Sequence, residues 1–467
     1  MHKSFVFCLL LLECLMACQT ENPEPVDLLI LNARIIDVSS GNVSDDRFIA
    51  IRQDTIRFVG EMADTSKYIA SVRLDANHRL AMPGLWDMHV HFRGGDTLIQ
   101  ENQNLLPLFL AHGVTTVRDA GGDITPSVLA WRKAIRAGQL DGPDIFTSGP
   151  KLDGANPAWP GSIPITTAED ISPALDSLQQ LGVDYVKTYD GSLTKEMYYE
   201  IVRQTEERGL KITGHMPFDA SILEAADLGL DGTEHLYYAM TAASPVRDSL
   251  RALGKGFGSL PDYIETYDPQ LAKQAFETLG SREFYATPTL HVGHTIANLH
   301  QADHSSDPLL AFMGPGIQQT YERRVRGAQN ASPEQQQRRT RMEGIFQSMV
   351  APMRQAGINI LAGSDCGPYN SYVYPGASLQ EELILLVEAG LTPREALEAS
   401  IINGPKFFQL SDAYGSLATG KVANLILLDR NPLENMENIR SINTVVKGAK
   451  VYDQEKMQVM MDATKPD

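Results

Sequence analysis

Eight short apolar segments that end in polar residues constrain the fold of this chain more than any other feature. They span residues 85–91, 115–118, 144–148, 184–188, 211–215, 232–236, 286–291 and 358–365. Each has the length of a β-strand, and stretches with helical periodicity lie between them, such as 172–180, 195–208 and 379–389. This alternation predicts an α/β fold, a closed (β/α)8 TIM barrel. An open doubly wound sheet is the alternative, but it does not explain polar residues at the end of nearly every strand.

The two ends of the chain predict a second, smaller domain. Residues 26–82 contain short strands broken by polar turns, and residues 409–467 contain apolar strands at 423–428 and 444–451. We expect these two parts to complete one small β-sandwich beside a barrel of residues 83–408. Residues 151–167 and 294–341 interrupt the alternation, so they are candidates for an active-site loop and a lid. A surface insertion is an equally ordinary interpretation of the second.

The first residues have the pattern of an export signal. Lys3 precedes an apolar run at 5–12, which is too short to span a bilayer, and Leu15-Met16-Ala17-Cys18 follows. This pattern resembles a bacterial lipobox and implies a lipoprotein signal peptide at 1–17, a lipidated Cys18 and a tether at 18–25. A plain secretory signal cleaved elsewhere is the alternative. Both predict an exported protein, and Gln19 slightly favours the outer membrane.

Charge and cysteine content narrow the partners. The chain of 467 residues has a formal net charge of -18, and no lysine and arginine cluster stands out in its sequence, so nucleic acid is not an expected partner. An acidic surface is repelled by anionic lipids, so membrane attachment is expected through the lipid anchor only. After processing, Cys366 is the remaining thiol and no disulfide can form. The sequence leaves the oligomeric state open.

Polar residues at successive strand ends form a candidate metal site. His89 and His91 are two residues apart on one strand, so both side chains face the same way. Two such histidines alone could be structural. The complete set holds four histidines, a lysine and an aspartate at strand ends, which is specific for a metal hydrolase. The set comprises His89, His91, Lys187, His215, His235 and Asp365.

The segment Pro83-Gly84-Leu85-Trp86-Asp87-Met88-His89-Val90-His91 resembles the first-strand motif of the amidohydrolase superfamily. The order and strand assignment of the other ligands match that family, and segments 378–383, 388–393 and 415–428 resemble its closing sequence. Asn424 stands where the family usually has aspartate, and residues 402–405 differ from its usual turn. The resemblance covers residues 26–452.

The resemblance implies a binuclear centre of two divalent metal ions, for which the residue types favour zinc. One ion would take His89, His91, Asp365 and a carboxylated Lys187, and the other would take the same Lys187 with His215 and His235. Carbon dioxide would convert the free amine of Lys187 into a bridging carbamate. A hydroxide between the ions would be the nucleophile, and catalytic Asp365 would pass its proton to the leaving group. An exposed or salt-bridged lysine is the alternative for Lys187.

The type of hydrolase is narrowed by one absence. Deaminases of the superfamily usually carry a glutamate three residues after the fifth-strand histidine, where this chain has Phe218. The same absence disfavours an imidazolonepropionase-like enzyme. Lys187 after a valine, Pro288-Thr289-Leu290 and the tyrosines after His235 are similar to the Xaa-Pro dipeptidase group. We therefore expect hydrolysis of a C–N amide bond in a dipeptide or at the C-terminal residue of a short peptide.

Four side chains are candidates to bind the terminal carboxylate of a peptide substrate: Arg118, Tyr237, Tyr238 and His291. Packing aromatics and a strand-end ion pair are the ordinary alternatives for these residues. The same metal pair could instead attack a lactone, a cyclic amide or an N-acyl amino acid. An inactive surface binding lipoprotein is a further alternative, which the intact ligand set disfavours.

Overall fold

The computed structural model describes residues 22–466. The predicted signal peptide, Cys18 and part of the tether lie outside the described residues. Among those that are described, no helix combines the length and apolar character needed to cross a bilayer.

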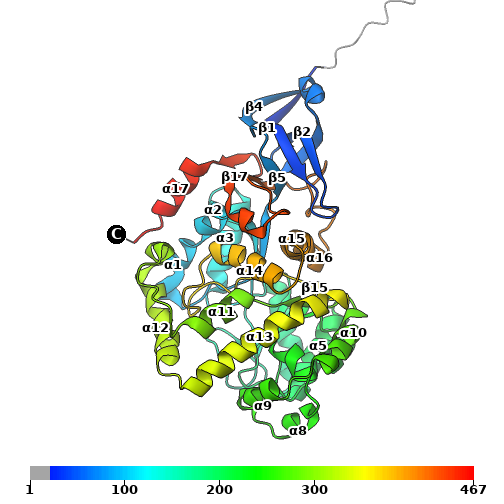
Figure 1. Cartoon of the computed structure of the whole chain (residues 1–467), viewed down its shortest axis with the longest axis vertical. Coiled ribbons are helices and arrows are strands. Elements are labelled where there is room, and N and C mark those ends of the chain that lie inside the picture. The colour runs from blue at the N-terminus through cyan, green and yellow to red at the C-terminus, as the bar shows by residue number, and fades with distance from the viewer. Residues whose placement is uncertain (1–21, 467) are drawn as a thin grey trace, which may run out of the picture.

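Both chain ends contribute strands to one eight-stranded sheet, at the top of Figure 1. Its strands are β1 (Glu24–Ile36), β2 (Val43–Arg52), β3 (Thr55–Glu61), β4 (Tyr68–Asp75), β5 (Leu80–Pro83), β16 (Asn424–Leu428), β17 (Ile442–Lys447) and β18 (Lys450–Tyr452). The strand order is β18-β17-β16-β5-β1-β2-β3, and β4 pairs in parallel with β1. The antiparallel pairing of β5 with β16, in which Ala81 lies opposite Leu427, joins the two ends. The strand expected at 444–451 is a hairpin that turns at Gly448 instead.

Each of the eight predicted central segments contains a strand. These are β6 (Leu85–Val90), β7 (Val114–Asp119), β8 (Asp144–Thr147), β11 (Val186–Thr188), β12 (Ile212–Gly214), β13 (Gly232–Glu234), β14 (Tyr285–Thr287) and β15 (Asn359–Ile360). All pair in parallel, within sheets ordered β6-β7-β8, β10-β9-β11-β12 and β13-β14-β15. The short strands β9 (Leu152–Asp153) and β10 (Ile163–Pro164) come from the segment 151–167.

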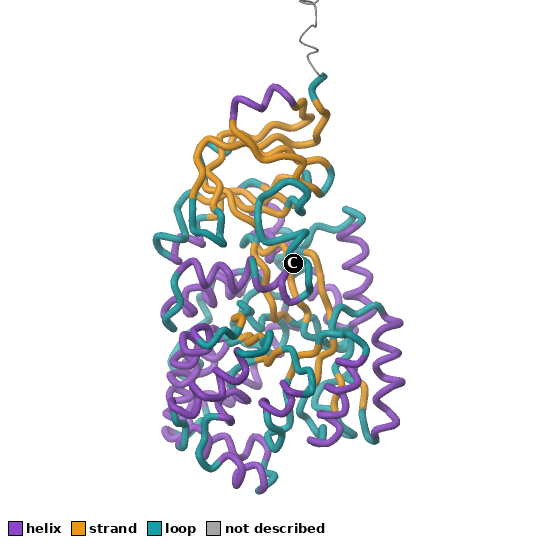
Figure 2. Tube along the Cα trace, turned by 90° about the vertical axis from the view of Figure 1, so that its right-hand side faces the viewer, coloured by secondary structure: helices purple, strands orange, loops and turns teal. Residues whose placement is uncertain are grey.

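Backbone hydrogen bonds connect each of these three sheets to the next. The Asp184 amide donates to the Thr147 carbonyl at 2.9 Å, and the Asp231 amide donates to the Ile212 carbonyl at 3.2 Å. A parallel bridge between Val90 and Cys366 links the end of the third sheet to the first. The fold is therefore a mixed α/β arrangement of parallel strands with helices outside them, as the tube in Figure 2 shows.

Helices follow most of the central strands. They are α1 (Ile99–Gln103), α2 (Leu106–Ala111), α3 (Thr125–Arg136), α4 (Ile171–Leu181), α5 (Lys195–Glu207), α6 (Ile222–Asp227), α7 (Tyr237–Ala242), α8 (Arg247–Ala252), α9 (Leu260–Glu265), α10 (Pro269–Gly280), α11 (Leu290–Asn298), α12 (Pro315–Gln329), α13 (Pro333–Gln355), α14 (Ala377–Glu388), α15 (Pro393–Ile401), α16 (Asn403–Phe407) and α17 (Gln454–Asp462). In α4 the buried residues Ile171, Ala174, Leu175 and Leu178 follow helical spacing, and Gly182 ends the helix with a left-handed φ of 68°.

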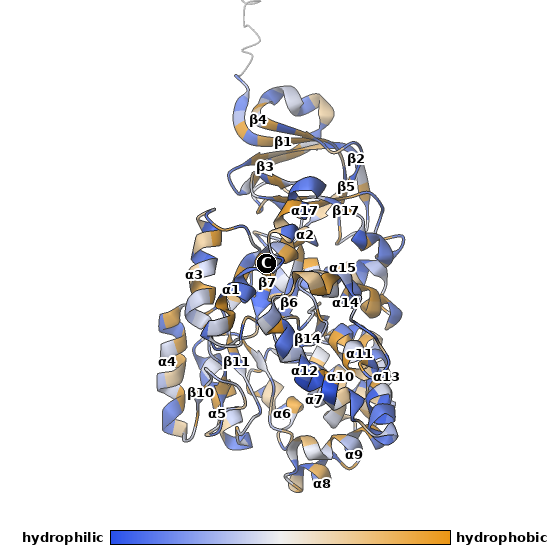
Figure 3. Ribbon diagram, turned by 90° about the vertical axis from the view of Figure 1, so that its left-hand side faces the viewer, coloured by the Kyte–Doolittle hydropathy of each residue, from blue (hydrophilic) through white to orange (hydrophobic). Residues whose placement is uncertain are grey.

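The long segment 294–341 is mostly helical. It holds the end of α11, all of α12 and the start of α13. The Glu101 carboxylate accepts hydrogen bonds from the Gly316 and Ile317 amides at 3.0 and 2.7 Å, which fixes the first turn of α12 to α1. Many hydrophilic residues lie on α12 and α13 (Figure 3). The segment is thus an ordered part of the wall around the strand ends.

Candidate metal centre

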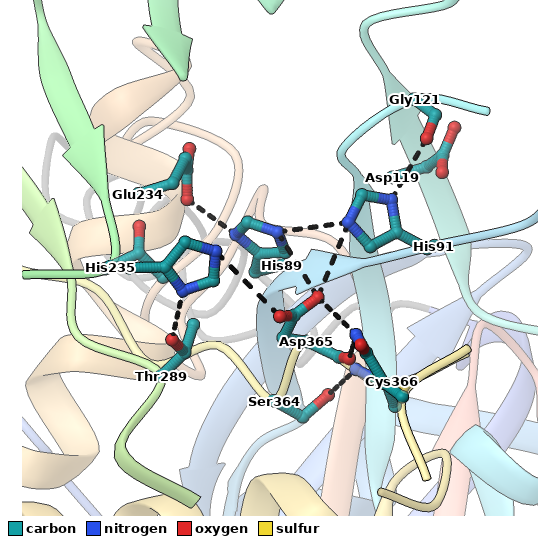
Figure 4. Close-up of polar contacts among 12 residues, drawn as sticks. His89, His91, Asp119, Gly121, Glu234, His235, Thr289, Ser364, Asp365 and Cys366 are labelled. Carbon is teal, nitrogen blue, oxygen red and sulfur yellow. Dashed lines mark hydrogen bonds and ion pairs between the residues drawn. The ribbon is translucent and has the colours of Figure 1, made fainter. Parts of the chain in front are cut away.

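Four of the predicted ligands meet directly beyond the carboxyl ends of the strands (Figure 4). The Nε2 atoms of His89 and His91 lie 3.3 Å apart. Asp365, which follows β15, places Oδ1 3.6 Å from the Nε2 of His89 and 3.4 Å from that of His91. His235, which follows β13, places Nε2 3.9 Å from the other oxygen of Asp365. Donor atoms of His89, His91 and Asp365 all fall within 4.8 Å of one another, a spacing that suits one ion.

The tautomers of these histidines follow from what their Nδ1 atoms contact. The Nδ1 of His89 lies 2.7 Å from a Glu234 oxygen, and that of His91 lies 3.0 Å from the Gly121 carbonyl. Both partners can only accept, so each Nδ1 carries the hydrogen. The Nδ1 of His235 lies 2.6 Å from the Thr289 hydroxyl, which already donates to the Pro288 carbonyl and must therefore accept here.

The tautomer of His215 is fixed in the same way, by a chain of two hydrogen bonds. Its Nδ1 lies 3.0 Å from the Tyr238 hydroxyl, which donates to the Asp190 carboxylate at 2.9 Å. The ring of His215 lies 5.0 Å from that of His235. All four imidazoles therefore hold their hydrogen on Nδ1 and leave the Nε2 lone pair free.

Burial favours the neutral form of three of these rings, those of His89, His91 and His235. It lowers the pKa of His89 and holds the pKa values of His91 and His235 well below their ordinary range, with nearby cations adding to the effect. Two lone pairs 3.3 Å apart, on His89 and His91, repel each other unless a cation lies between them. The donor set therefore fits a divalent metal ion better than it fits hydrogen bonding alone.

Lys187 is buried in β11, 1% exposed, with Nζ 3.9 Å from Glu234. Nζ is among the buried polar atoms without a hydrogen-bond partner. Burial, with a smaller contribution from Arg118 and Arg93, lowers the pKa of Lys187 to about 8. An exposed position for this lysine is thereby excluded, whereas an ion pair with Glu234 is present. At that pKa roughly a tenth of the side chain is a free amine at pH 7.

Glu234 is a central buried carboxylate that sequence reasoning overlooked. It contacts His89, receives a hydrogen bond from Thr213 at 2.6 Å and binds Arg118 at 2.7 Å. Nearby cations hold its pKa well below its ordinary range despite the opposing effect of burial. Its position immediately before His235 was the signal that could have identified it.

Arg118 does not reach the substrate side, contrary to the prediction. Its side chain is 0% exposed, and it donates to Glu234, to the Met88 carbonyl at 2.6 Å and to Thr287. These partners lie beneath the predicted metal-binding residues, so Arg118 positions Glu234 and does not reach a bound substrate.

A cavity of about 260 Å³ opens over the metal ligands. Tyr237 is among its lining residues, whereas His291 is not. Tyr238 acts through His215, as described above. The apolar part of the wall comprises Phe257, Pro288, Leu290, Val292, Ile296 and Phe346.

Two of the predicted ligands have an unusual backbone. His235 has a φ of 60° and Asp365 a φ of 56°, in the left-handed region that side chains other than glycine seldom adopt. The surrounding structure holds both: the His235 amide donates to the Thr287 carbonyl and the Asp365 amide to the His89 carbonyl. Backbone strain of this kind is concentrated at functional sites.

A family model decides the assignment: residues 80–452 match that of the amidohydrolase family. The chain belongs to the amidohydrolase family. This amidohydrolase is accordingly a hydrolase that acts on carbon–nitrogen bonds. The matched residues include all six predicted metal ligands.

Individual relatives of this amidohydrolase are distant. It is 21% identical to the ochratoxinase of Aspergillus niger over 483 residues, which cover 91% of this chain and 86% of that protein. A putative prolidase from Bifidobacterium longum superposes with a TM-score of 0.65 at 21% identity, covering 95% of this chain and 100% of that one. A Xaa-Pro dipeptidase with bound methionine superposes with a TM-score of 0.66 at 19% identity, covering 91% and 99%. At these identities the two structures establish a shared fold.

Proposed function

We propose that this amidohydrolase is a binuclear metallopeptidase that hydrolyses a dipeptide or releases the C-terminal residue of a short peptide. The observation that carries the proposal is that four imidazoles have Nδ1 fixed by hydrogen bonds and Nε2 free. The proposed ligands are His89, His91, His215, His235, Asp365 and carboxylated Lys187. Each residue has a donor suited to zinc, and Lys187 is buried and lacks a hydrogen-bond partner.

Two divalent ions, when bound, would supply a water activated near neutral pH and would polarise the scissile carbonyl. The chain itself supplies the proton transfer. Asn370 donates to Oδ1 of Asp365 at 2.7 Å, which orients the carboxylate. Asp365 also lines the cavity, so it can take a proton from the attacking water and deliver it to the leaving amine.

The proposal includes a closed (β/α)8 barrel. Hydrogen bonds between successive sheets and the bridge from Val90 to Cys366 support a continuous ring of eight strands. Ligands at the carboxyl ends of five different strands agree with the location of active sites in such barrels.

The names of the similar proteins support a peptide-like substrate. Two similar structures are a putative prolidase and a Xaa-Pro dipeptidase, and one of the curated relatives is an ochratoxinase. The apolar wall of the cavity suits an aliphatic or aromatic side chain on the amino-terminal side of the scissile bond.

We also propose that the protein is an exported lipoprotein anchored through Cys18. The described chain starts at the end of the eight-stranded sheet that lies away from the helical body in Figure 1, so a tether there would leave the cavity accessible. Metabolic labelling with a fatty acid tests this proposal. A Cys18→Ala variant that still incorporates label, or an unprocessed native chain, contradicts it.

The test of the activity uses the chain from Gln19 onward, with zinc and bicarbonate, and a library of dipeptides. We expect about two metal ions per chain and cleavage of some dipeptides. In Lys187→Ala, which lacks the bridging carbamate, we expect fewer metal ions per chain and loss of activity. Lys195→Ala, at the surface start of α5, is the matched control and should behave like the unchanged protein. One ion or none in the unchanged protein, or full activity in Lys187→Ala, rejects the binuclear mechanism.

A further inference from the structure

A second cavity of about 520 Å³ adjoins the one above the metal ligands. Arg93, Trp159 and Arg324 line both cavities, so the two share part of their walls. Its wall carries five basic side chains: Arg93, Lys151, Arg323, Arg324 and Arg339. Asp123 is the acidic residue that lines it, and its carboxylate accepts a hydrogen bond from the Gly94 amide at 2.8 Å.

This concentration of positive charge is unusual in a chain whose net charge is -18. Within residues 22–466, many lysines and arginines form ion pairs with carboxylates, whereas none of these five does. Arg323 and Arg324 lie on α12 and Arg339 lies on α13, so the segment that interrupts the strand and helix alternation supplies three of the five cations. Residues 294–341 therefore supply much of the positive charge that lines this cavity.

The two inner cations are buried and held in place. Arg93 and Lys151 are 5% and 3% exposed. The Arg93 guanidinium lies 4.1 Å from the centre of the Trp159 ring, and its Nε donates to the Pro368 carbonyl at 3.0 Å. Lys151 Nζ lies 5.4 Å from the same ring. Burial and the charge of Arg93 hold the pKa of Lys151 well below its ordinary range, so an anionic ligand beside Nζ would favour the charged form of this lysine. Burying cations without a counter-ion is unfavourable, and an anionic ligand would offset that cost.

We propose that this cationic cavity binds the two carboxylates of an acidic C-terminal residue, glutamate or aspartate, of the peptide substrate. This inference rests on the proposed function, because it assigns the leaving group of that reaction. One α-carboxylate needs one or two cations, whereas five cations opposed by one carboxylate leave room for a second negative charge. The apolar cavity over the metal ligands then takes the residue on the other side of the scissile bond.

The test compares kcat/KM for leucyl-glutamate and leucyl-glutamine, which differ by one charge at nearly equal shape. We expect the glutamate peptide to be preferred by about tenfold or more at low ionic strength, with the preference falling as salt is added. Arg339→Gln should lower kcat/KM for the glutamate peptide about tenfold more than it lowers kcat/KM for the glutamine peptide. Arg326→Gln is the matched control, since Arg326 lies on α12 but pairs with Glu322 outside this cavity.

A binding measurement separates failure of this inference from failure of the proposed function. Calorimetry of the zinc-loaded protein should show tighter binding of glutarate than of pentanoate, and Arg339→Gln should remove most of the difference. If no amide is cleaved but glutarate binding still depends on Arg339, the cavity binds dianions and the peptidase proposal fails. If peptides are cleaved with no preference for glutamate and glutarate binds no better than pentanoate, the assignment of the leaving group is overturned.

Discussion

Glu234→Gln should lower both the stability of the fold and the affinity of the proposed centre for zinc. Glu234 accepts from three donors, on His89, Arg118 and Thr213. Glutamine keeps the shape but removes the charge, and its NH2 group must face either the Nδ1 hydrogen of His89 or the Arg118 guanidinium. Removing one partner of a buried ion pair costs about 3–5 kcal/mol, because the remaining charge stays buried without compensation. Losing the hydrogen-bond partner of a metal-binding histidine lowers metal affinity about 10–100-fold.

Urea unfolding of the metal-free protein and competitive zinc titration measure the two effects separately. Asp231→Asn is the matched control, because Asp231 forms a 2.6 Å ion pair with Lys211, just before the neighbouring strand β12, and no contact with a predicted metal ligand is found for it among the described residues. We expect the control to lose stability without losing zinc affinity. A Glu234→Gln protein that unfolds within about 1 kcal/mol of the unchanged protein and binds zinc equally well would refute the role given to Glu234.

Three further expectations concern single residues. With the pKa of Lys187 at about 8, the fraction of free amine rises from roughly a tenth at pH 7 to roughly nine-tenths at pH 9. The rate at which zinc reactivates the metal-free protein, measured at constant dissolved CO2, should therefore rise about ninefold between these pH values. A rate that stays flat or falls contradicts the carbamate. Tyr238→Phe removes the acceptor for the Nδ1 hydrogen of His215 and should lower kcat about tenfold with little change in KM, measured on the best dipeptide; an unchanged kcat contradicts the role of this hydrogen-bond chain. Burial raises the pKa of the Cys366 thiol well above its ordinary value, so iodoacetamide should modify it only as the protein unfolds, and rapid labelling of native protein would show otherwise.

The positions of the central strands could be predicted because burial leaves a clear local pattern. Each strand is a short apolar run whose end carries a polar residue, and all eight runs contain a strand. β5 could not be located within residues 26–82, because Leu80–Pro83 is four residues long and ends in proline, so it carries no periodic signal. The hairpin of β17 and β18 was read as one strand because only its tertiary pairing, and not its apolar content, reveals the turn.

The depth of a side chain below the strand ends could not be predicted. Arg118 and Lys187 both occur near strand ends, yet Arg118 extends beneath the predicted ligands while Lys187 interacts electrostatically with two of them, His89 and Asp365. Sequence position gives the strand and its face but not how far a long side chain reaches. The cationic cavity was hidden for a related reason, since Arg93 and Arg324 are far apart in sequence and only the packing of α12 brings them to one wall.

The pairing of β5 with β16 also sets an order of events in the making of the molecule. Pro83 lies opposite Leu425, so about 340 residues must follow β5 before its partner exists. A chain that emerges amino end first at about 5–20 residues per second leaves that edge of the sheet open for roughly 20 to 70 seconds. An open edge invites pairing with other chains. The last strands therefore cover the open edge of β5 once synthesis is complete. A chain that ended before Asn424 would leave this edge able to pair with other chains, although it would contain every predicted metal ligand.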